Sequence, residues 1–450
     1  MVGKIDKSPQ LNIFEIPLKS FINLKHELCI LSSEIDWEHV EEDFSVYYKS
    51  IGRPSIPIRK IVGLTLLRQI YNLSDEAIID RWIENPYWQY FCGEHVFQKD
   101  KPMDPTEFVH FRKRIGEEGT EKLLKLSVKL FGNEANETEV LIDSTVQEKN
   151  ITYPTDSKLH KRIIEKVNKI AKKEGIQLRQ SYVRIVKQLM IDQRFRNHPK
   201  RKKKARAAAR KLKTIAGRLT RDLERRLTLE QVSRYNSDIK LFFKVLLQEK
   251  NSKNKVYSLH EPFVNCIAKG KEAKKFEFGN KTGIVVTKNT GIIVGALAFE
   301  NNPYDGHTLE PHLQQVERLT GKRPKVGIVD RGYKGKKKIN ETEIVAPKAP
   351  TKTATSYQKQ KARKRFRARA GIEPIIGHVK HDHRMIINYL KGTQGDKINT
   401  LLAATAFNFK KKLNRIKAEL SSFYIFQICL FVDLFFARIS YIKNRAFFQG

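Results

Sequence analysis

Residues 366–384 have the sequence FRARAGIEPIIGHVKHDHR, in which Glu373 lies among many cations. If this stretch is helical, the side chains at i−7, i−4, i, i+3 and i+7 share one face: Phe366, Arg369, Glu373, Ile376 and Lys380. Taken alone, the pattern is typical of a solvated basic helix with one ion-paired glutamate. Its significance therefore depends on what other segments bring to Glu373.

Gly371 and Pro374 interrupt this helical pattern. Proline is tolerated only in the first turn of a helix, because elsewhere it removes a backbone donor and clashes with the preceding turn. We therefore predict a helix that begins near Ile372 or is kinked there.

Two other acidic residues follow apolar runs. Asp143 follows Val140-Leu141-Ile142, and Asp330 follows residues 326–329, Val-Gly-Ile-Val. Each run predicts a short buried strand that places a carboxylate at its end. Such a carboxylate needs a compensating cation, and a divalent metal is the usual one. Three carboxylates without a His or Cys cluster favour Mg²⁺ or Mn²⁺ over zinc.

These segments resemble bacterial insertion-sequence transposases of the DDE class, of the group named for insertion sequence five. In that group a first Asp lies in a context like LIDSTVQEKNITYPTD, which occupies residues 141–156 here, and a second lies in a DRGY-like turn. The Glu lies in a helix with the pattern Tyr-x2-Arg-x3-Glu-x6-Lys, and Phe366 stands at the Tyr position. The resemblance extends from about Phe44 to Lys412 and includes GRPSIPIRKIVGL near the start.

The resemblance implies a ribonuclease-H-like catalytic domain that binds element ends and cleaves and joins DNA. We expect Asp143 to bridge two Mg²⁺ ions, which Mn²⁺ can replace, with Asp330 and Glu373 each completing one metal shell. Arg369 and Lys380 are expected to hold phosphate near the scissile bond. The expected partners are inverted-repeat ends and target DNA, bound by a homodimer or a larger assembly.

The composition is strongly basic. Lys and Arg number 86 against 49 Asp and Glu, a net charge of +37, so a polyanion is the expected partner. The four cysteines are isolated, which argues against a disulfide framework or a zinc site. With no apolar segment of the secretory type near the N-terminus, we expect a cytoplasmic, nucleoid-associated bacterial protein.

The apolar stretch from Phe423 to Ala437 raises a membrane question. It is about 15 residues long and contains Gln427 and Asp433, whereas a membrane span needs roughly 20 apolar residues. We interpret it as a packing helix or a subunit contact and expect no membrane partner.

Residues 1–135 are predicted to form a helical domain for DNA binding or assembly. Apolar spacing predicts a helix from about Pro57, and Ser74 is a candidate N-cap for the next one. The pair is compatible with a helix-turn-helix unit or with a plain helical hairpin. A further helix is expected over residues 104–115, with three cations that could meet phosphates: Arg112, Lys113 and Arg114.

Residues 136–415 are predicted to form an α/β, ribonuclease-H-like domain with a mixed sheet. Strands are expected at residues 256–259, 282–288 and 292–299, with a hairpin turn at 289–291, then a helix and the strand that ends in Asp330. Asp305 and His307 are interpreted as capping or loop residues rather than ligands. Beyond Asn388, helices are expected to close the unit near Leu413, and residues 416–450 are expected to form an apolar helical tail.

A long basic helical insertion is expected at about residues 156–250. Between Arg194 and Arg226 lie fifteen Lys or Arg against Asp222 and Glu224. A charge run of this kind is often solvated or disordered, but its place between candidate catalytic strands favours helices along DNA phosphates. Residues 351–369 carry eight cations and no acid, which predicts a mobile basic loop over substrate. The remaining expected DNA contacts lie in these two segments: Lys200, Arg201, Lys202, Lys203, Lys204, Arg363, Lys364 and Arg365.

Two alternatives remain open. A serine or tyrosine recombinase would use a covalent intermediate, and would leave the three acidic segments unexplained. A DNA-binding or RNA-binding protein without catalysis would use these acids structurally. Metal-dependent nicking of DNA with the right ends distinguishes these possibilities.

Overall fold

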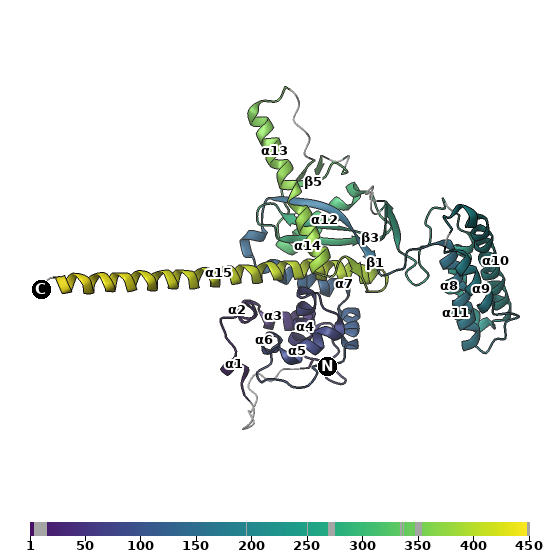
Figure 1. Ribbon diagram of the computed structural model, residues 1–450, viewed down its shortest axis with the longest axis horizontal. Helices are drawn as coiled ribbons and strands as arrows, with labels where there is room; N and C mark the ends of the chain where they lie inside the picture. The colour runs from purple at the N-terminus through teal and green to yellow at the C-terminus, as the bar shows by residue number, and fades with distance from the viewer. Residues whose placement is uncertain are drawn as a thin grey trace.

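A computed structural model describes residues 1–3, 16–194, 196–249, 251–268, 275–333, 335, 337–346 and 353–447, apart from the side chains of residues 361, 362, 365 and 424–447. Figure 1 shows an N-terminal group of helices, a central sheet, a separate group of helices to one side, and a long C-terminal helix. The chain is a mixed α/β protein with a helical N-terminal part. This arrangement agrees with the predicted fold class.

Most of the N-terminal helices pack around one apolar cluster that includes the apolar side chains of α4, a helix in which almost every residue is buried. Ser74 caps α5, because its hydroxyl accepts a hydrogen bond from the Ala77 amide at 3.1 Å. Gly116 interrupts α7 with φ 60° and ψ −156°, so its first helical segment ends where the sequence predicted. The seven helices are α1 (Leu18–Phe21), α2 (Glu27–Glu34), α3 (Trp37–Ser45), α4 (Ile58–Ile70), α5 (Asp75–Glu84), α6 (Pro86–Phe91) and α7 (Thr106–Lys129).

The central sheet has the order β2-β3-β1-β5-β7-β6, with β4 also paired to β3 and β8 to β1. β1 pairs antiparallel with β3 and parallel with β5, and β3 and β4 form the predicted hairpin. The strands are β1 (Glu139–Lys149), β2 (Asn265–Ala268), β3 (Phe276–Thr287), β4 (Ile293–Phe299), β5 (Val326–Val329), β6 (Lys338–Ile339), β7 (Thr342–Val345) and β8 (Ile387–Asn388).

Successive residues of the sheet pack into different apolar clusters, because strand side chains alternate between faces. Leu141 joins a cluster with α14 (Ile372–Asp382) and α15 (Gly392–Phe447), whereas Val140 and Ile142 join one with α12 (Asp305–Thr320). A sheet covered on both faces explains the continuous apolar run before Asp143.

Two predicted strand positions need correction. Residues 256–259 form no strand, and β1 extends six residues past Asp143 to Lys149. The polar residues after Asp143 suggested the end of a strand, but they pair with β3 and β8. Asp143 therefore lies within β1.

The helices between β1 and β2 have an apolar cluster of their own. In α10 the leucines, Ala208, Ile215 and Ala216 pack into this cluster while most of the cations face solvent, so the charge run is an amphipathic helix. Figure 1 shows these helices beside the sheet. They are α8 (Asp156–Lys173), α9 (Val183–Asp192), α10 (Lys202–Arg226) and α11 (Leu229–Leu247), with a 3₁₀ turn η2 (Pro199–Arg201).

The loop predicted over residues 351–369 is wrong for its larger part, which forms helix α13 (Ser356–Ala370). Thr355 and Gln358 form a capping box, which supplies the missing start signal. The prediction that separate helices close the unit beyond Asn388 was also wrong, because α15 is one continuous helix. Its residues join both the N-terminal cluster and the sheet cluster, and Figure 1 shows it passing between these two parts.

The side chains of the apolar tail from residue 424 lie outside the described residues. Among the residues that the structure describes, no helix has a stretch both long and apolar enough to cross a membrane. Cys29, Cys92 and Cys266 are free thiols.

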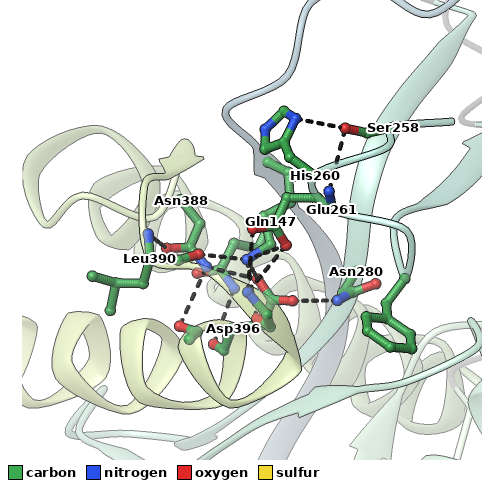
Figure 2. Close-up of polar contacts among 12 residues, drawn as sticks. Gln147, Ser258, His260, Glu261, Asn280, Asn388, Leu390 and Asp396 are labelled. Atoms are coloured by element: carbon green, nitrogen blue, oxygen red, sulfur yellow. Dashed lines mark hydrogen bonds and ion pairs between the residues drawn. The ribbon is translucent and has the colours of Figure 1, made fainter. Parts of the chain in front are cut away.

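A buried polar network joins the end of β1 to the start of α15 (Figure 2). Lys149 Nζ lies 2.8 Å from Asp396 Oδ1 and 3.5 Å from Glu261 Oε2, and all three side chains are nearly inaccessible to solvent. Asn388 and Asn280 donate hydrogen bonds to the Asp396 carboxylate. These contacts fix the strand that carries Asp143 against α15.

Candidate active site

The sheet register brings Asp143 and Asp330 to neighbouring positions. Ile142 pairs with Val329 where β1 and β5 run parallel, so the next residue on each strand is an aspartate. Asp330 directly follows β5, as predicted, and its carbonyl accepts a hydrogen bond from the Tyr333 amide at 3.1 Å in the following turn.

Glu373 lies in the first turn of α14, which begins at Ile372 as predicted. Pro374 is therefore in the first turn, where its missing N–H costs no helical hydrogen bond. Lys380 lies seven residues further along the same helix and is partly buried.

Arg369, near the end of α13, is the cation around which the three carboxylates gather. Its Nη1 lies 2.8 Å from Glu373 Oε1, and its Nη2 lies 3.2 Å from Asp143 Oδ2 and 3.5 Å from Asp330 Oδ2. The guanidinium side chain is 20% exposed. The three predicted acids thus share one cation, although they come from distant parts of the chain.

The second oxygen of each aspartate is held by the backbone. Asp143 Oδ1 accepts a hydrogen bond from the Ser144 amide at 2.7 Å, and Asp330 Oδ1 accepts one from the Arg331 amide at 2.6 Å. The Oδ2 atoms of both aspartates face the Arg369 guanidinium instead. Among the described residues, however, no three His, Cys, Asp or Glu side chains are arranged to hold a metal ion.

Phe366 packs near the Asp330 turn. The Arg331 guanidinium lies 5.9 Å from the centre of the Phe366 ring, a distance at which a cation interacts with an aromatic face. The ring supports the turn, so this contact does not need the hydroxyl of the family's tyrosine.

Asp305 contacts the residue next to Asp143, which sequence reasoning did not predict. At the start of α12, its Oδ1 accepts hydrogen bonds from Ser144 Oγ at 2.9 Å and from Lys281 Nζ at 3.0 Å. It thereby connects α12 to the residue after Asp143. Its place just before a helix suggested a cap, and no sequence signal relates it to Ser144, which is 161 residues away.

Burial keeps two neighbouring side chains neutral. Burial, then the charges of Asp143 and Asp305, raise the pKa of Tyr333, so its phenol stays protonated. Burial also lowers the pKa of His312 to about 3. The His312 ring lies over Gly283, where an added Cβ would be 1.9 Å from Nε2, so this strand position requires glycine.

The predicted DNA-contacting cations differ in their surroundings. Arg112 is buried and both its terminal nitrogens bind Asp75, at 3.1 and 2.7 Å, so we remove it from the expected phosphate contacts. Lys113 and Arg114 are exposed, and Arg114 stacks over the Tyr48 ring at 4.4 Å.

The cations around the start of α10 and in α13 face solvent. This applies to Lys200, Arg201, Lys202, Lys203, Lys204, Arg363 and Lys364. Lys204 also pairs with Asp192 at 2.9 Å. The side chain of Arg365 lies outside the described residues.

Comparisons with known proteins match two parts of the chain, and Asp143 lies between them. Residues 16–114 match the family described as "Transposase domain (DUF772)", and residues 250–409 match "Transposase DDE domain". A protein of Rhizobium meliloti named "Uncharacterized protein ORF8 in nfe locus" is 41% identical over 192 residues, which cover 42% of this chain and 93% of that protein. No solved structure matches the chain.

The two transposase families match the N-terminal helices and most of the sheet with α14 and the start of α15, and the predicted carboxylates meet at that sheet. The chain has a ribonuclease-H-like fold and a transposase role. It belongs to the DDE transposases of insertion sequences.

Proposed function

We propose that this transposase binds the inverted-repeat ends of its element, cleaves them in a metal-dependent reaction, and joins the freed 3′ ends to target DNA. The observation that carries this proposal is the gathering of Asp143, Asp330 and Glu373 around one guanidinium. Three carboxylates from separate segments are costly to bring together, and a site for cations is the simplest reason for their meeting.

The donor set fits a hard divalent cation. All three side chains offer carboxylate oxygens, and the Oδ2 atoms of Asp143 and Asp330 already face a positive charge. We propose that these three residues hold two Mg²⁺ ions, or Mn²⁺ in their place. When bound, such ions supply charge relief on the scissile phosphate and lower the pKa of the attacking water or hydroxyl.

Arg369 has two roles in this proposal. Without DNA and metal, its guanidinium offsets part of the negative charge of the three carboxylates and holds them near one another. With substrate, it turns to a phosphate beside the scissile bond, where its planar fork suits two oxygens. Lys380, on the same helix as Glu373, holds a second phosphate.

Exposed cations of α10, α13 and α7 are proposed to bind the DNA backbone. Phosphate contacts of this type fix orientation and carry no sequence information, so they suit a long duplex of any sequence. An element has two ends, so we expect a dimer or larger assembly on DNA. We keep residues 1–135, 136–415 and 416–450 as proposed domains, and the insertion-sequence-five group as a proposed assignment.

The test uses purified protein and a duplex that carries the inverted repeat beside the coding region. We expect nicking at the element boundary in Mg²⁺ and none with chelator. A matched duplex with a scrambled repeat should be bound more weakly and left intact. Tight binding of the repeat without nicking under any divalent metal would favour a non-catalytic DNA-binding protein.

A further inference from the structure

A cavity of about 770 Å³ lies between the N-terminal helices and the segment that follows α14. The two parts dock beside it: Gln69 Nε2 donates to the His383 carbonyl at 2.7 Å, and Arg384 Nη1 donates to the Asn72 carbonyl at 3.3 Å. Ligand sites favour such boundaries and volumes.

Five cations and two acids line this cavity: Arg68, Arg112, Lys113, Arg384, Lys391, Asp75 and Glu76. Asp75 is already engaged by two of the cations, because Arg68 lies 2.5 Å and Arg112 lies 2.7 Å from its carboxylate. Lys113 and Lys391 are exposed and form no ion pair with an acid among the described residues. The cavity therefore favours an anion.

The cavity also offers an aromatic face. Tyr389 lines it with 59% of its surface exposed, and the Arg384 guanidinium lies 5.7 Å from the ring centre. Val109 beside it is 40% exposed. A ring exposed next to cations suits a nucleobase attached to a phosphate, because bases stack on aromatic faces.

The length of α14 indicates how far the cavity lies from the active site. Glu373 is in its first turn and Asp382 is its last residue, so their backbone positions lie about 14 Å apart along the helix axis, and Arg384, which lines the cavity, follows two residues later. One DNA strand advances about 3.4 Å per nucleotide. A strand with its scissile phosphate at Glu373 therefore reaches the cavity about four or five nucleotides away.

We propose that this cavity binds one nucleotide of the DNA substrate, with its phosphate on Lys113, Arg384 and Lys391 and its base on Tyr389. The inference rests on the proposed DNA cleavage, because it places the cavity along the strand being cut. It assigns an additional substrate contact at the boundary of the two parts.

The test measures the affinity of the full chain for inverted-repeat duplexes, each with one abasic site moved stepwise from the boundary. We expect one position, about four or five nucleotides from the scissile phosphate, to lose affinity by about five-fold to hundred-fold. Tyr389→Ala should remove this dependence and Tyr389→Phe should keep it. Tyr153→Ala, at a ring equally exposed but outside the cavity, is the matched control.

A second variant reports on the phosphate without depending on the ring. Lys391→Gln should reduce the slope of log affinity against log salt by about 0.9, the value for one phosphate. An unchanged abasic pattern in Tyr389→Ala together with an unchanged salt slope in Lys391→Gln would overturn the proposal. Binding of free deoxynucleoside monophosphate that Tyr389→Ala abolishes, without any displacement of the duplex from wild type, would also overturn it, in favour of a free-nucleotide site.

Wild-type cleavage is measured on the same duplexes to separate the two proposals. If the wild type nicks the boundary while the cavity variants behave like wild type, only the cavity assignment fails. If the wild type binds with the expected abasic pattern but nicks nothing, the cavity assignment stands and the proposed cleavage fails.

Discussion

Lys149→Met is predicted to cause a large loss of stability. Lys149 Nζ contacts Asp396 and Glu261, and the three side chains are 2%, 2% and 6% exposed (Figure 2). Methionine keeps the volume but removes the charge, so two buried carboxylates lose their cation. Breaking a buried pair in this way costs about 3–5 kcal/mol, a large part of the about 5–15 kcal/mol by which a domain is stable.

The assay is urea unfolding of the wild type and variant. Lys101→Met is the matched control, because Lys101 pairs with Asp80 at 2.8 Å but both side chains are more than 60% exposed. An exposed pair contributes about 1 kcal/mol or less. A loss below about 1 kcal/mol for Lys149→Met, or an equal loss for both variants, would refute the reasoning.

The stability difference between Lys149→Met and wild type should also depend on pH, in a direction that the pKa of Asp396 determines. Burial already raises the pKa of Asp396 despite the nearby Lys149, and removing the cation raises it further. A carboxylate with a raised folded-state pKa binds protons more readily when folded, so its cost is full at neutral pH and lessens in acid. The stability gap between Lys149→Met and wild type should narrow as pH falls. A gap that widens would contradict the account.

Three other predictions concern the site and its support. Arg369→Gln should tighten Mn²⁺ binding, measured by calorimetry, by about five-fold, because the guanidinium competes with the metal ion for the carboxylates. Five-fold is equivalent to about 1 kcal/mol. An unchanged Mn²⁺ affinity would exclude this competition. Asp305→Asn should lower the rate of end cleavage about ten-fold to hundred-fold with DNA affinity unchanged, since Asp305 holds Ser144 and Lys281; wild-type rates would remove it from the site. Burial lowers the pKa of His383 from 6.5 to about 4, so between these two pH values the unfolded chain binds a proton that the folded chain does not. The free energy of unfolding should therefore decrease as the pH falls from 6.5 to about 4. An equally steep decrease in His383→Gln would assign the effect to other groups.

Local patterns predicted the elements that carry the acids. The apolar run before Asp330 indicated β5, and the positions of Gly371 and Pro374 indicated where α14 begins. The order of strands and helices indicated the fold. These signals depend on neighbouring residues, which is why they could be recognised without a structure.

Features that depend on distant residues were missed. Gln147 and Lys149 looked like the polar end of a strand, yet they are buried because Asp396, far along the chain, supplies their partners. Helical spacing placed Arg369 beside Glu373, but nothing in the sequence predicted that one guanidinium also contacts Asp143 and Asp330. In α13 the capping box at Thr355 was a local signal that the density of cations concealed.

The central claim is tested most directly by substituting the three acids one at a time and measuring cleavage of inverted-repeat DNA in Mg²⁺. Asp143→Asn, Asp330→Asn and Glu373→Gln should each abolish nicking and keep DNA affinity, because losing a negative charge does not weaken attraction to phosphate. The matched control is Glu343→Gln, because Glu343 is an exposed acid on β7, which pairs with β5. This variant should nick DNA like wild type. Near-normal nicking by any one of the three variants would contradict the assignment of that residue to the catalytic centre.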